Sequence, residues 1–270
     1  MAVLQRWPGS GCSVWDTLAG VAEVDLSQRV IVVTGASRGL GAGLADWFAA
    51  RGARVGLCAR TKPDFPTGTQ GDARAVSVEV DMTDDAAVEA FAETVTSRLG
   101  PPDLWINNAG VLDPIVPQRD LTPGALLDHL NINVVGVLNG TRAYLRELEQ
   151  VDASGALVNI SSGAAVNGRA GWSAYCAAKA AVDRLSEALA VEEPDRLPVV
   201  LSVYPGLIET GMQELIRSQS AEVQPDVEWF RDRHRSGAMN TPAWVAETIA
   251  GWVFGGQRPE AVIAKVPDNF

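Results

Sequence analysis

A tyrosine and a lysine four residues apart are the first residues in this sequence whose types and spacing could do chemistry. Tyr175 and Lys179 stand in an alanine-rich segment with helical spacing, so both side chains would lie on one face of a helix. A phenol there could give a proton to a carbonyl oxygen or take one from an alcohol, and a neighbouring ammonium group favours the ionised phenol. The pair therefore predicts a general acid–base tyrosine whose pKa is lowered by Lys179. The alternative is a tyrosine ring packed on the aliphatic part of a lysine.

Ser162 stands thirteen residues before Tyr175, just after a buried strand predicted at 156–160. Its hydroxyl could hydrogen-bond to the carbonyl oxygen that Tyr175 would protonate. A serine at such a place also commonly caps a turn. A nucleophilic role is not favoured, because no histidine lies near Ser162 in the sequence and Ser162 does not stand in a G-x-S-x-G pattern.

A glycine-rich turn follows the first predicted strand and opens a predicted helix. Gly35, Gly39 and Gly41 give the spacing G-x-x-x-G-x-G. Missing β-carbons let a pyrophosphate approach a helix N-terminus, so the turn predicts a dinucleotide site; a tight turn without a ligand is the alternative. The spacing is not the G-x-G-x-x-G of the standard Rossmann site, and no Lys-Ser or Lys-Thr pair follows as in a P-loop.

The residues after the second predicted strand bear on the choice of cofactor. NAD sites place an acidic residue there for the ribose hydroxyls, but this chain continues with Arg60. Arg60 and Arg38 of the glycine turn could bind a 2′-phosphate from two sides, because guanidinium groups match a phosphate in charge and geometry. We therefore expect NADP(H) rather than NAD(H); two solvated surface arginines are the alternative.

Alternating strands and helices must hold these residues in place. Short apolar runs rich in β-branched residues alternate with longer segments of helical spacing, which indicates a parallel sheet covered on both faces. We therefore expect an α/β fold, a single doubly wound Rossmann-type domain with a seven-stranded parallel sheet and helices on both faces. The strands are predicted at 30–33, 55–58, 75–80, 104–106, 156–160, 199–203 and 261–264, and the helices at 41–51, 84–99, 124–149 (with a break near 131–133) and 173–191.

Two segments lie outside this alternation. Residues 1–25 are predicted to be an N-terminal extension of a dinucleotide-binding domain at 26–270. Residues 206–240 follow the sixth predicted strand. Ligands bind at that edge of such sheets, so 206–240 is a candidate substrate lid.

Composition argues against several classes of protein. The 270 residues carry a net charge of −11, which repels phosphate backbones and argues against a nucleic-acid binder. The two histidines and three cysteines lie far apart, so we expect no metal site and no disulfide framework. We expect no membrane span, because no apolar run reaches about 18 residues. Residues 1–25 lack the continuous apolar core of a signal peptide, so we expect a cytoplasmic protein.

Taken together, these motifs resemble the short-chain dehydrogenase/reductase family over residues 27–255. The resemblance rests on the glycine turn, Ser162, the Tyr-x-x-x-Lys pair and three further patterns. Those patterns are Asn107-Asn108-Ala109-Gly110, Asn133-Val134-Val135-Gly136, and Pro205-Gly206 with Thr210 four residues on. The resemblance implies an oxidoreductase that uses a nicotinamide cofactor.

The resemblance also implies roles for individual residues. Tyr175 would be the general acid–base, Lys179 would lower its pKa and bind the nicotinamide ribose, and Ser162 would orient the substrate carbonyl. Asn133 would hold a water that links Lys179 to solvent. From the glycine turn and the resemblance together, the expected cofactor contacts are Gly35, Ser37, Arg38, Gly39, Leu40, Gly41, Arg60, Asp81, Met82, Asn108, Ala109, Gly110, Tyr175, Lys179, Pro205, Gly206, Ile208 and Thr210.

A narrower resemblance covers the C-terminal half. Segments 161–165, 171–176 and 210–217 are similar to the sepiapterin reductase and benzil reductase group, which reduces α-dicarbonyl compounds with NADPH. Asp268 lies near the end where pterin-reducing members use an acidic residue, but its neighbours match no motif, so that role is not carried over. The expected substrate contacts are Ser162, Gly163, Trp172, Met212 and Ile216, with Trp229, Phe230 and Met239 as further apolar candidates; ordinary core packing is the alternative for the apolar ones.

The predicted function is therefore NADPH-dependent reduction of a ketone, with an α-dicarbonyl compound or an aromatic ketone as substrate. One alternative is a 3-oxoacyl thioester reductase, which would need a basic surface for its carrier and is disfavoured by the net charge. Another is a non-catalytic NADP(H)-binding redox sensor, which we would expect to lack part of the set Asn133, Ser162, Tyr175 and Lys179. The resemblance also implies a homodimer or homotetramer packed through the helices at 124–149 and 173–191.

Overall fold

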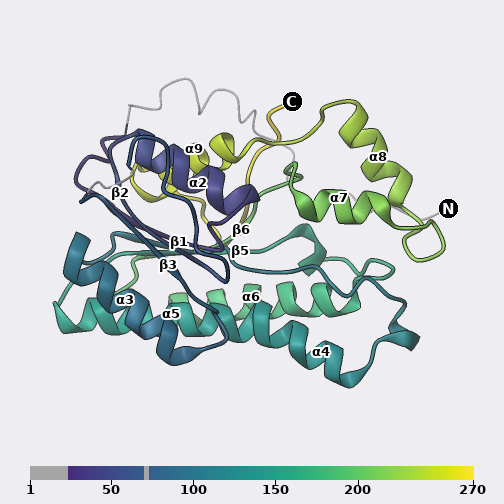
Figure 1. The fold of residues 1–270 in the computed structure, drawn as a ribbon, viewed down its shortest axis with the longest axis horizontal. Helices are drawn as coiled ribbons and strands as arrows, with labels where there is room; N and C mark the ends of the chain where they lie inside the picture. Colours follow the sequence, from purple (N-terminus) through teal and green to yellow (C-terminus); the bar gives the residue numbers. More distant parts are fainter. Residues whose placement is uncertain (1–23, 70–72) are drawn as a thin grey trace.

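A parallel β-sheet forms the centre of the computed structural model, which describes residues 24–69 and 73–270 (Figure 1). Within these ranges, seven strands pair in the order β3-β2-β1-β4-β5-β6-β7, all of them parallel. The order reverses between β1 and β4, which leaves a crevice at the carboxyl ends of these strands. The predicted single α/β domain is confirmed. The strands are β1 (Val30–Thr34), β2 (Arg54–Ala59), β3 (Ala75–Glu79), β4 (Leu104–Asn107), β5 (Ala156–Ile160), β6 (Val199–Tyr204) and β7 (Ile263–Lys265).

Helices cover both faces of this sheet. Helices α2 and α9 lie over one face, and α3, α5 and α6 lie over the other (Figure 1). The helices that the sequence predicted begin and end within two residues of their expected bounds, whereas α7, α8 and α9 were not predicted. The helices are α2 (Gly39–Ala50), α3 (Asp85–Leu99), α4 (Pro123–Leu130), α5 (Gly136–Gln150), α6 (Ser173–Glu192), α7 (Gly211–Ser218), α8 (Val227–Arg235) and α9 (Pro242–Val253).

The sheet carries a separate apolar core on each face, because successive strand residues point to opposite sides. Ile31 and Val33 of β1 belong to the core beneath α2 and α9. Val30 and Val32 belong to the core on the side of α3, α5 and α6. All residues of β1, β4 and β5 are buried, which fixes the carboxyl ends of these strands firmly.

The expected break in the helix predicted at 124–149 is a π-helical turn at Asn131–Val135. It joins α4 to α5, and Asn133 is buried at its centre. Single π-turns inserted between α-helices occur frequently at functional sites. The irregularity therefore lies at one of the predicted catalytic residues.

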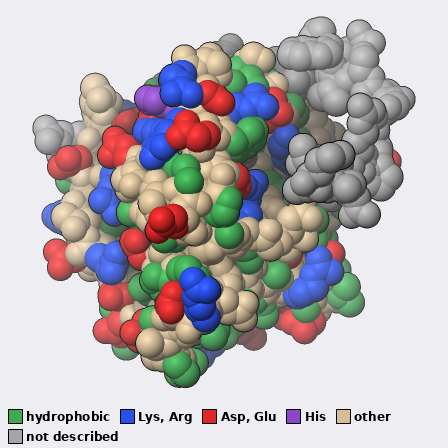
Figure 2. Space-filling view, turned by 90° about the vertical axis from the view of Figure 1, so that its right-hand side faces the viewer, with side chains coloured by type: hydrophobic (Ala, Val, Ile, Leu, Met, Phe, Trp, Pro, Cys, Tyr) green, Lys and Arg blue, Asp and Glu red, His purple; other side chains and the backbone are tan. Residues whose placement is uncertain are grey.

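Helices α7 and α8 lie beyond the carboxyl edge of the sheet, within the segment predicted as a lid (Figure 1). Acidic and basic side chains lie next to one another at this end of the molecule (Figure 2). Glu209, for example, contacts both Arg217 at 2.6 Å and His234 at 2.8 Å. The lid surface is therefore mixed in charge.

Two further sequence predictions concern the N-terminal extension and the absence of a membrane-spanning segment. Apart from Val24 and Asp25, the extension predicted at 1–25 lies outside the described residues. None of the helices found in the described ranges is both long and apolar enough to cross a membrane.

Candidate active site

Ser162, Tyr175 and Lys179 meet beside the crevice at the carboxyl end of β5. Ser162 follows β5, while α6 places Tyr175 and Lys179 about one turn apart on its buried side. The Tyr175 hydroxyl shares a hydrogen bond with Ser162. The Lys179 ammonium group lies 5.6 Å from the centre of the Tyr175 ring and donates to the Ile160 carbonyl oxygen at 2.7 Å. The structure thus brings three of the predicted catalytic side chains together.

Ser162 also caps a turn, as its alternative interpretation expected. Its Oγ accepts a hydrogen bond from the Ala164 amide at 3.2 Å, at the start of the 3₁₀ turn Gly163–Ala165. That bond uses one lone pair of Oγ and leaves the hydroxyl proton available to a second acceptor. The cap therefore orients the hydroxyl group without occupying its donor.

Burial has the largest effect on the pKa of Tyr175. Removal from water raises the pKa of Tyr175 to about 12, and the hydrogen bond with Ser162 opposes this rise. The expectation that Lys179 lowers this pKa stays a prediction; the ammonium group faces the Tyr175 ring and the Ile160 carbonyl oxygen. Burial also lowers the pKa of Lys179 to about 8, and the charge of Asp183 opposes that shift. Tyr175 therefore keeps its proton at neutral pH.

Asn133 lies next to this group, across Gly110 from Lys179. Its Oδ1 accepts from the Val111 amide at 3.0 Å, and its Nδ2 donates to the Val111 carbonyl oxygen at 3.1 Å. A β-carbon at Gly110 would lie 2.7 Å from Asn133 Oδ1 and 3.8 Å from Lys179 Nζ. The backbone after β4 therefore fits between Asn133 and Lys179 only because residue 110 is glycine.

The glycine turn is held tightly against the end of β4. A β-carbon at Gly35, where φ is +67°, would lie 2.7 Å from Ala109 Cα, and one at Gly41 would lie 2.5 Å from Asn108 Nδ2. Asn108 Nδ2 donates to the carbonyl oxygens of Thr34 at 2.8 Å and Gly35 at 3.2 Å. The side chain of Asn108 therefore orders the turn.

This turn fits the pyrophosphate of a dinucleotide. Helix α2 begins at Gly39, and its N-cap residue, Arg38, makes no side-chain capping bond. The first amide groups of α2 are thus left uncapped by that side chain at the positive end of the helix, where an anion is stabilised. Ser37 and Leu40 flank the same helix start.

Further predicted cofactor residues stand at the carboxyl ends of β2 and β3. Arg60 follows β2 and is exposed, as is Arg38, and neither forms an ion pair with a carboxylate of the described residues. Asp81 follows β3, and its carboxylate accepts hydrogen bonds from the Thr83 amide and hydroxyl, both at 2.9 Å. Met82 is buried beside it. Two arginines without carboxylate partners in the described ranges therefore lie at the glycine turn and after β2, where the 2′-phosphate of NADP(H) is expected.

The chain after β6 approaches the glycine turn from the lid side. A β-carbon at Gly39 would lie 3.1 Å from the Thr210 methyl group, so the start of α7 reaches the glycine turn. Asn240 anchors this segment, because its Nδ2 donates to the Pro205 carbonyl oxygen at 3.1 Å and its backbone pairs with Ile208. The predicted cofactor contacts Pro205, Ile208 and Thr210 are thus held against the crevice.

An apolar cluster distinct from the two sheet cores surrounds the Tyr175 ring. Trp172 stands edge-on to Tyr175 with 5.9 Å between ring centres and packs on Phe230 at 5.7 Å. The buried members of this apolar cluster are Leu112, Ile115, Ala164, Trp172, Tyr175, Ile216 and Phe230. The lid helices α7 and α8 contribute Ile216 and Phe230, so the lid forms one wall of this cluster.

The other apolar candidates take different positions. Met212 packs against the cluster. Trp229 stands edge-on to Phe230 but is 42% exposed, so it lies at the rim. Met239 does not belong to the cluster. The structure thus groups Trp172, Met212 and Ile216 around Tyr175 but not Met239.

Comparison with known proteins identifies the family. The family model described as short chain dehydrogenase matches residues 29–221. The chain belongs to this family. The dehydrogenase is therefore an oxidoreductase of alcohol and ketone groups that uses a nicotinamide cofactor, NAD or NADP, and its glycine turn and uncapped α2 fit that cofactor.

Individual relatives support the narrower resemblance. The dehydrogenase is 30% identical over 228 residues to the benzil reductase ((S)-benzoin forming) of Bacillus subtilis (strain 168), covering 82% of this chain and 92% of the relative. It is 32% identical over 198 residues to the NADPH-dependent pterin aldehyde reductase of Arabidopsis thaliana, covering 72% and 81%. The crystal structure of the KRED1-Pglu enzyme matches with a TM-score of 0.77 at 30% identity, over 87% of this chain and 98% of that one. These matches confirm the resemblance to the benzil and sepiapterin reductase group.

Sequence reasoning missed buried polar groups behind the catalytic side chains of the dehydrogenase. Asp183 on α6 accepts hydrogen bonds from Ser202 at 2.7 Å and from Tyr204, both on β6. Its spacing of four residues from Lys179 was the available signal. His129 on α4 hydrogen-bonds with Asn133, and again a spacing of four residues was the signal.

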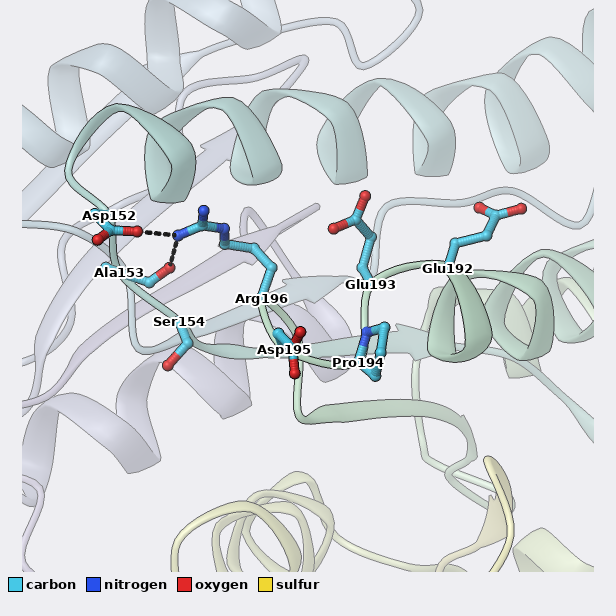
Figure 3. Close-up of a pocket in the computed structure, with 8 residues that line it drawn as sticks. All are labelled: Asp152, Ala153, Ser154, Glu192, Glu193, Pro194, Asp195 and Arg196. Atoms are coloured by element: carbon cyan, nitrogen blue, oxygen red, sulfur yellow. Dashed lines mark hydrogen bonds and ion pairs between the residues drawn. The ribbon is translucent and has the colours of Figure 1, made fainter.

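A hollow of about 360 Å³ lies at the opposite edge of the sheet, where the loops before β5 and β6 meet (Figure 3). Arg196 joins these loops by bonds to Asp152 at 3.3 Å and to the Ala153 carbonyl oxygen at 2.7 Å. Glu193 and Asp195 make the remaining lining acidic, which disfavours an anionic cofactor. In the described ranges, no three His, Cys, Asp or Glu side chains are grouped to hold a metal ion.

Proposed function

We propose that this dehydrogenase reduces a ketone with NADPH and that its substrate is an α-dicarbonyl compound or an aromatic ketone. The observation that carries the proposal is the position of Tyr175. Its hydroxyl bonds to Ser162, while its ring lies in the apolar cluster with Trp172 and Phe230. A proton donor thus stands at the wall of an aromatic-lined site.

The catalytic residues act on the carbonyl oxygen of the substrate. Ser162 Oγ and Tyr175 Oη donate hydrogen bonds to this oxygen and hold the carbonyl group beside the crevice. The reduced nicotinamide, when bound, supplies a hydride to the carbonyl carbon. Tyr175 gives its proton to the oxygen as negative charge develops there, and its pKa of about 12 keeps it in the acid form at neutral pH. Lys179 stabilises the tyrosinate that results, and a water held by Asn133 returns a proton from solvent.

Charge supports NADPH over NADH. Arg38 and Arg60 flank the glycine turn and the end of β2 without carboxylate partners among the described residues. No acidic residue occupies the position after β2 that would bind ribose hydroxyls. A 2′-phosphate would give both guanidinium groups a partner. The printed name of the Arabidopsis relative is also NADPH-dependent.

The wall of the site supports an aromatic or vicinal dicarbonyl substrate. Trp172 and Phe230 offer ring faces and edges to a flat, apolar compound. The Bacillus relative is named for benzil, an aromatic vicinal diketone. A carrier-bound thioester is less favoured, because Arg217 and His234 of the lid pair with Glu209 instead of forming a free basic surface.

Initial rates with the purified protein test this proposal. NADPH and NADH are compared against benzil, a phenyl-alkyl dione, sepiapterin and a 3-oxoacyl thioester. NADPH-dependent reduction of a dione is expected. In Tyr175→Phe, kcat falls by about 10² to 10⁴-fold, because the general acid is lost, while NADPH still binds. Arg60→Ala weakens NADPH binding and leaves NADH binding unchanged.

Other outcomes would point to the alternatives. Tight NADPH binding without turnover of any carbonyl compound would favour a redox sensor. Turnover of the thioester alone would favour a 3-oxoacyl thioester reductase. A preference for NADH would overturn the roles of Arg38 and Arg60.

Assembly and location are part of the same proposal. We propose a homodimer or homotetramer packed through α5 and α6, which expose Leu138 and Leu185. The unpaired cysteines Cys58 and Cys176 suit a reducing compartment, and we propose the cytoplasm. A small-molecule carbonyl compound remains the proposed partner, with no nucleic acid and no membrane.

A further inference from the structure

His129 is a buried titratable side chain that the proposed mechanism does not use. It lies near the end of α4 with 2% of its surface exposed. Its Nδ1 lies 2.6 Å from the Asp113 carbonyl oxygen, and its Nε2 lies 3.0 Å from Asn133 Nδ2. Its ring stands nearly perpendicular to that of Tyr175, with 6.1 Å between their centres. The imidazole therefore contacts two of the predicted catalytic residues, Asn133 and Tyr175.

The hydrogen bonds of His129 permit one protonation state. The Asp113 carbonyl oxygen can only accept, so Nδ1 must carry a proton. Asn133 Oδ1 accepts from the Val111 amide, which fixes the orientation of the Asn133 amide and turns Nδ2 toward the imidazole, where it also lies 3.1 Å from the His129 carbonyl oxygen. A proton on Nε2 would face this donor group, so Nε2 is the unprotonated nitrogen. Only the neutral tautomer with its proton on Nδ1 satisfies both partners.

We propose that His129 is a positioning residue that holds the amide of Asn133 in place for the proton return to Tyr175. The proposal rests on the proposed function, because it assumes that Asn133 serves Lys179 during catalysis. The geometry that supports it is the tight fit at Gly110, which separates Asn133 from Lys179. A rotated Asn133 amide would release Val111 and shift the backbone that packs against the lysine.

Protonation of His129 would break this arrangement. A second proton on Nε2 would face the Asn133 N–H group, so two donors would oppose each other. The groups that face the ring are Lys179 and Tyr175 from α6 and Asp113 from the segment after β4. Burial lowers the pKa of His129, the Asp113 carbonyl and carboxylate oppose this shift, and the charge of Lys179 adds to it. Catalysis therefore requires neutral His129 and should weaken when acid protonates it.

The tautomer can be measured without any substrate. The chain has only two histidines, and the other one, His234, is half exposed and bonded to Glu209. The ¹⁵N spectrum of the imidazole groups in His234→Gln then reports His129 alone. We expect the neutral Nδ1–H tautomer at pH 7 and titration below the ordinary histidine pKa of about 6.5. An Nε2–H tautomer, or a charged ring at pH 7, would overturn the proposal.

Kinetics of three variants separate positioning from packing. His129→Gln keeps an acceptor that can reach Asn133, His129→Asn keeps only a donor near Asp113, and His129→Phe keeps only the ring volume. We expect kcat to fall about tenfold in the Asn and Phe variants and less than about threefold in the Gln variant, with KM nearly constant throughout. The acid limb of the kcat profile that belongs to His129 should disappear in the Gln variant, which cannot titrate.

A destabilised variant away from the site serves as the control. Phe91→Leu lies in the core beneath α3, and it should lower the melting temperature without changing kcat or its pH profile. If the three His129 variants lose kcat equally, or in proportion to their loss of melting temperature, the positioning role is wrong. If the wild type reduces no carbonyl compound, the proposed function fails, whereas the tautomer measurement still decides the state of His129.

Discussion

At the scale of single residues, the protonation states of Tyr175 and Lys179 suit reduction of a carbonyl group. Tyr175 is an acid with a pKa of about 12, and Lys179, with a pKa of about 8, is mostly charged at neutral pH. Keeping a charged ammonium group away from water costs stability. Because the folded pKa of Lys179 lies below its value of 10.5 in the unfolded chain, this cost is present in full below pH 8 and vanishes as the pH rises toward 10.5.

Lys179→Met should therefore make the protein more stable and inactive. At pH 7, removing the buried charge should raise the free energy of unfolding by up to about 3 kcal/mol. Losing the hydrogen bond to the Ile160 carbonyl oxygen should lower it by about 1 kcal/mol. Urea unfolding should show a gain of about 2 kcal/mol at pH 7 that shrinks near pH 10. Lys265→Met, at an exposed lysine paired with Asp268, should change stability by less than about 0.5 kcal/mol. A loss of stability in Lys179→Met at pH 7 would contradict this account of the buried charge.

At the scale of elements, the carboxyl ends of β1, β4 and β5 supply most of the site. The glycine turn leaves β1, Asn108 and Gly110 follow β4, and Ser162 follows β5. These three strands pair directly, so short loops after them meet at one edge. Function therefore depends on close backbone contacts between loops that are distant in the sequence.

Gly41→Ala should damage this junction far more than Gly124→Ala. The new β-carbon at position 41 would lie 2.5 Å from Asn108 Nδ2, whereas position 124 on α4 has open space around it. We expect Gly41→Ala to weaken cofactor binding at least about tenfold and to lower stability by roughly 1 to 3 kcal/mol. Gly124→Ala should bind normally and be slightly more stable, because alanine favours a helix. Cofactor titration by fluorescence and thermal melting measure both, and equal behaviour of the two variants would refute the steric argument.

At the scale of the whole molecule, the helices on one face of the sheet expose apolar side chains to solvent. Helices α2 and α9 pack on each other over one face, while α5 and α6 on the other face expose Leu138 at 43% and Leu185 at 39%. Exposed leucines on neighbouring helices are typical of a surface that is covered in an oligomer. The net charge of −11 opposes association of copies of the chain, and an apolar contact through these leucines would counter that repulsion.

The double variant Leu138→Glu, Leu185→Glu should therefore shift the protein toward the monomer. Buried carboxylates at an interface are costly, and like charges would face each other across a symmetric contact. Light scattering after size-exclusion chromatography should show the mass falling toward that of one 28.6 kDa chain. Val151→Glu, just beyond the end of α5 and already exposed, should keep the oligomeric mass. A monomeric wild type would remove the basis of the proposal.

The sequence by itself determined the α/β alternation, and it singled out Ser162, Tyr175 and Lys179, which the structure brings together. Apolar runs such as 30–33 are too continuous for a strand with one solvent-exposed face, and the glycine spacing has few uses other than a close approach of backbone and ligand. The pair Tyr175 and Lys179 follows from helical spacing alone. Local periodicity and rare residue types carry this information, so it can be read without the fold.

Only the tertiary structure decided what surrounds those residues. The pKa of Tyr175 depends on burial and on where the Lys179 ammonium group points, and spacing fixes neither. Helices α7 to α9 and the bond between His129 and Asn133 likewise depend on contacts between distant segments. Sequence fixes which groups one helix face presents, whereas desolvation and hydrogen-bond partners are set by the elements packed against it.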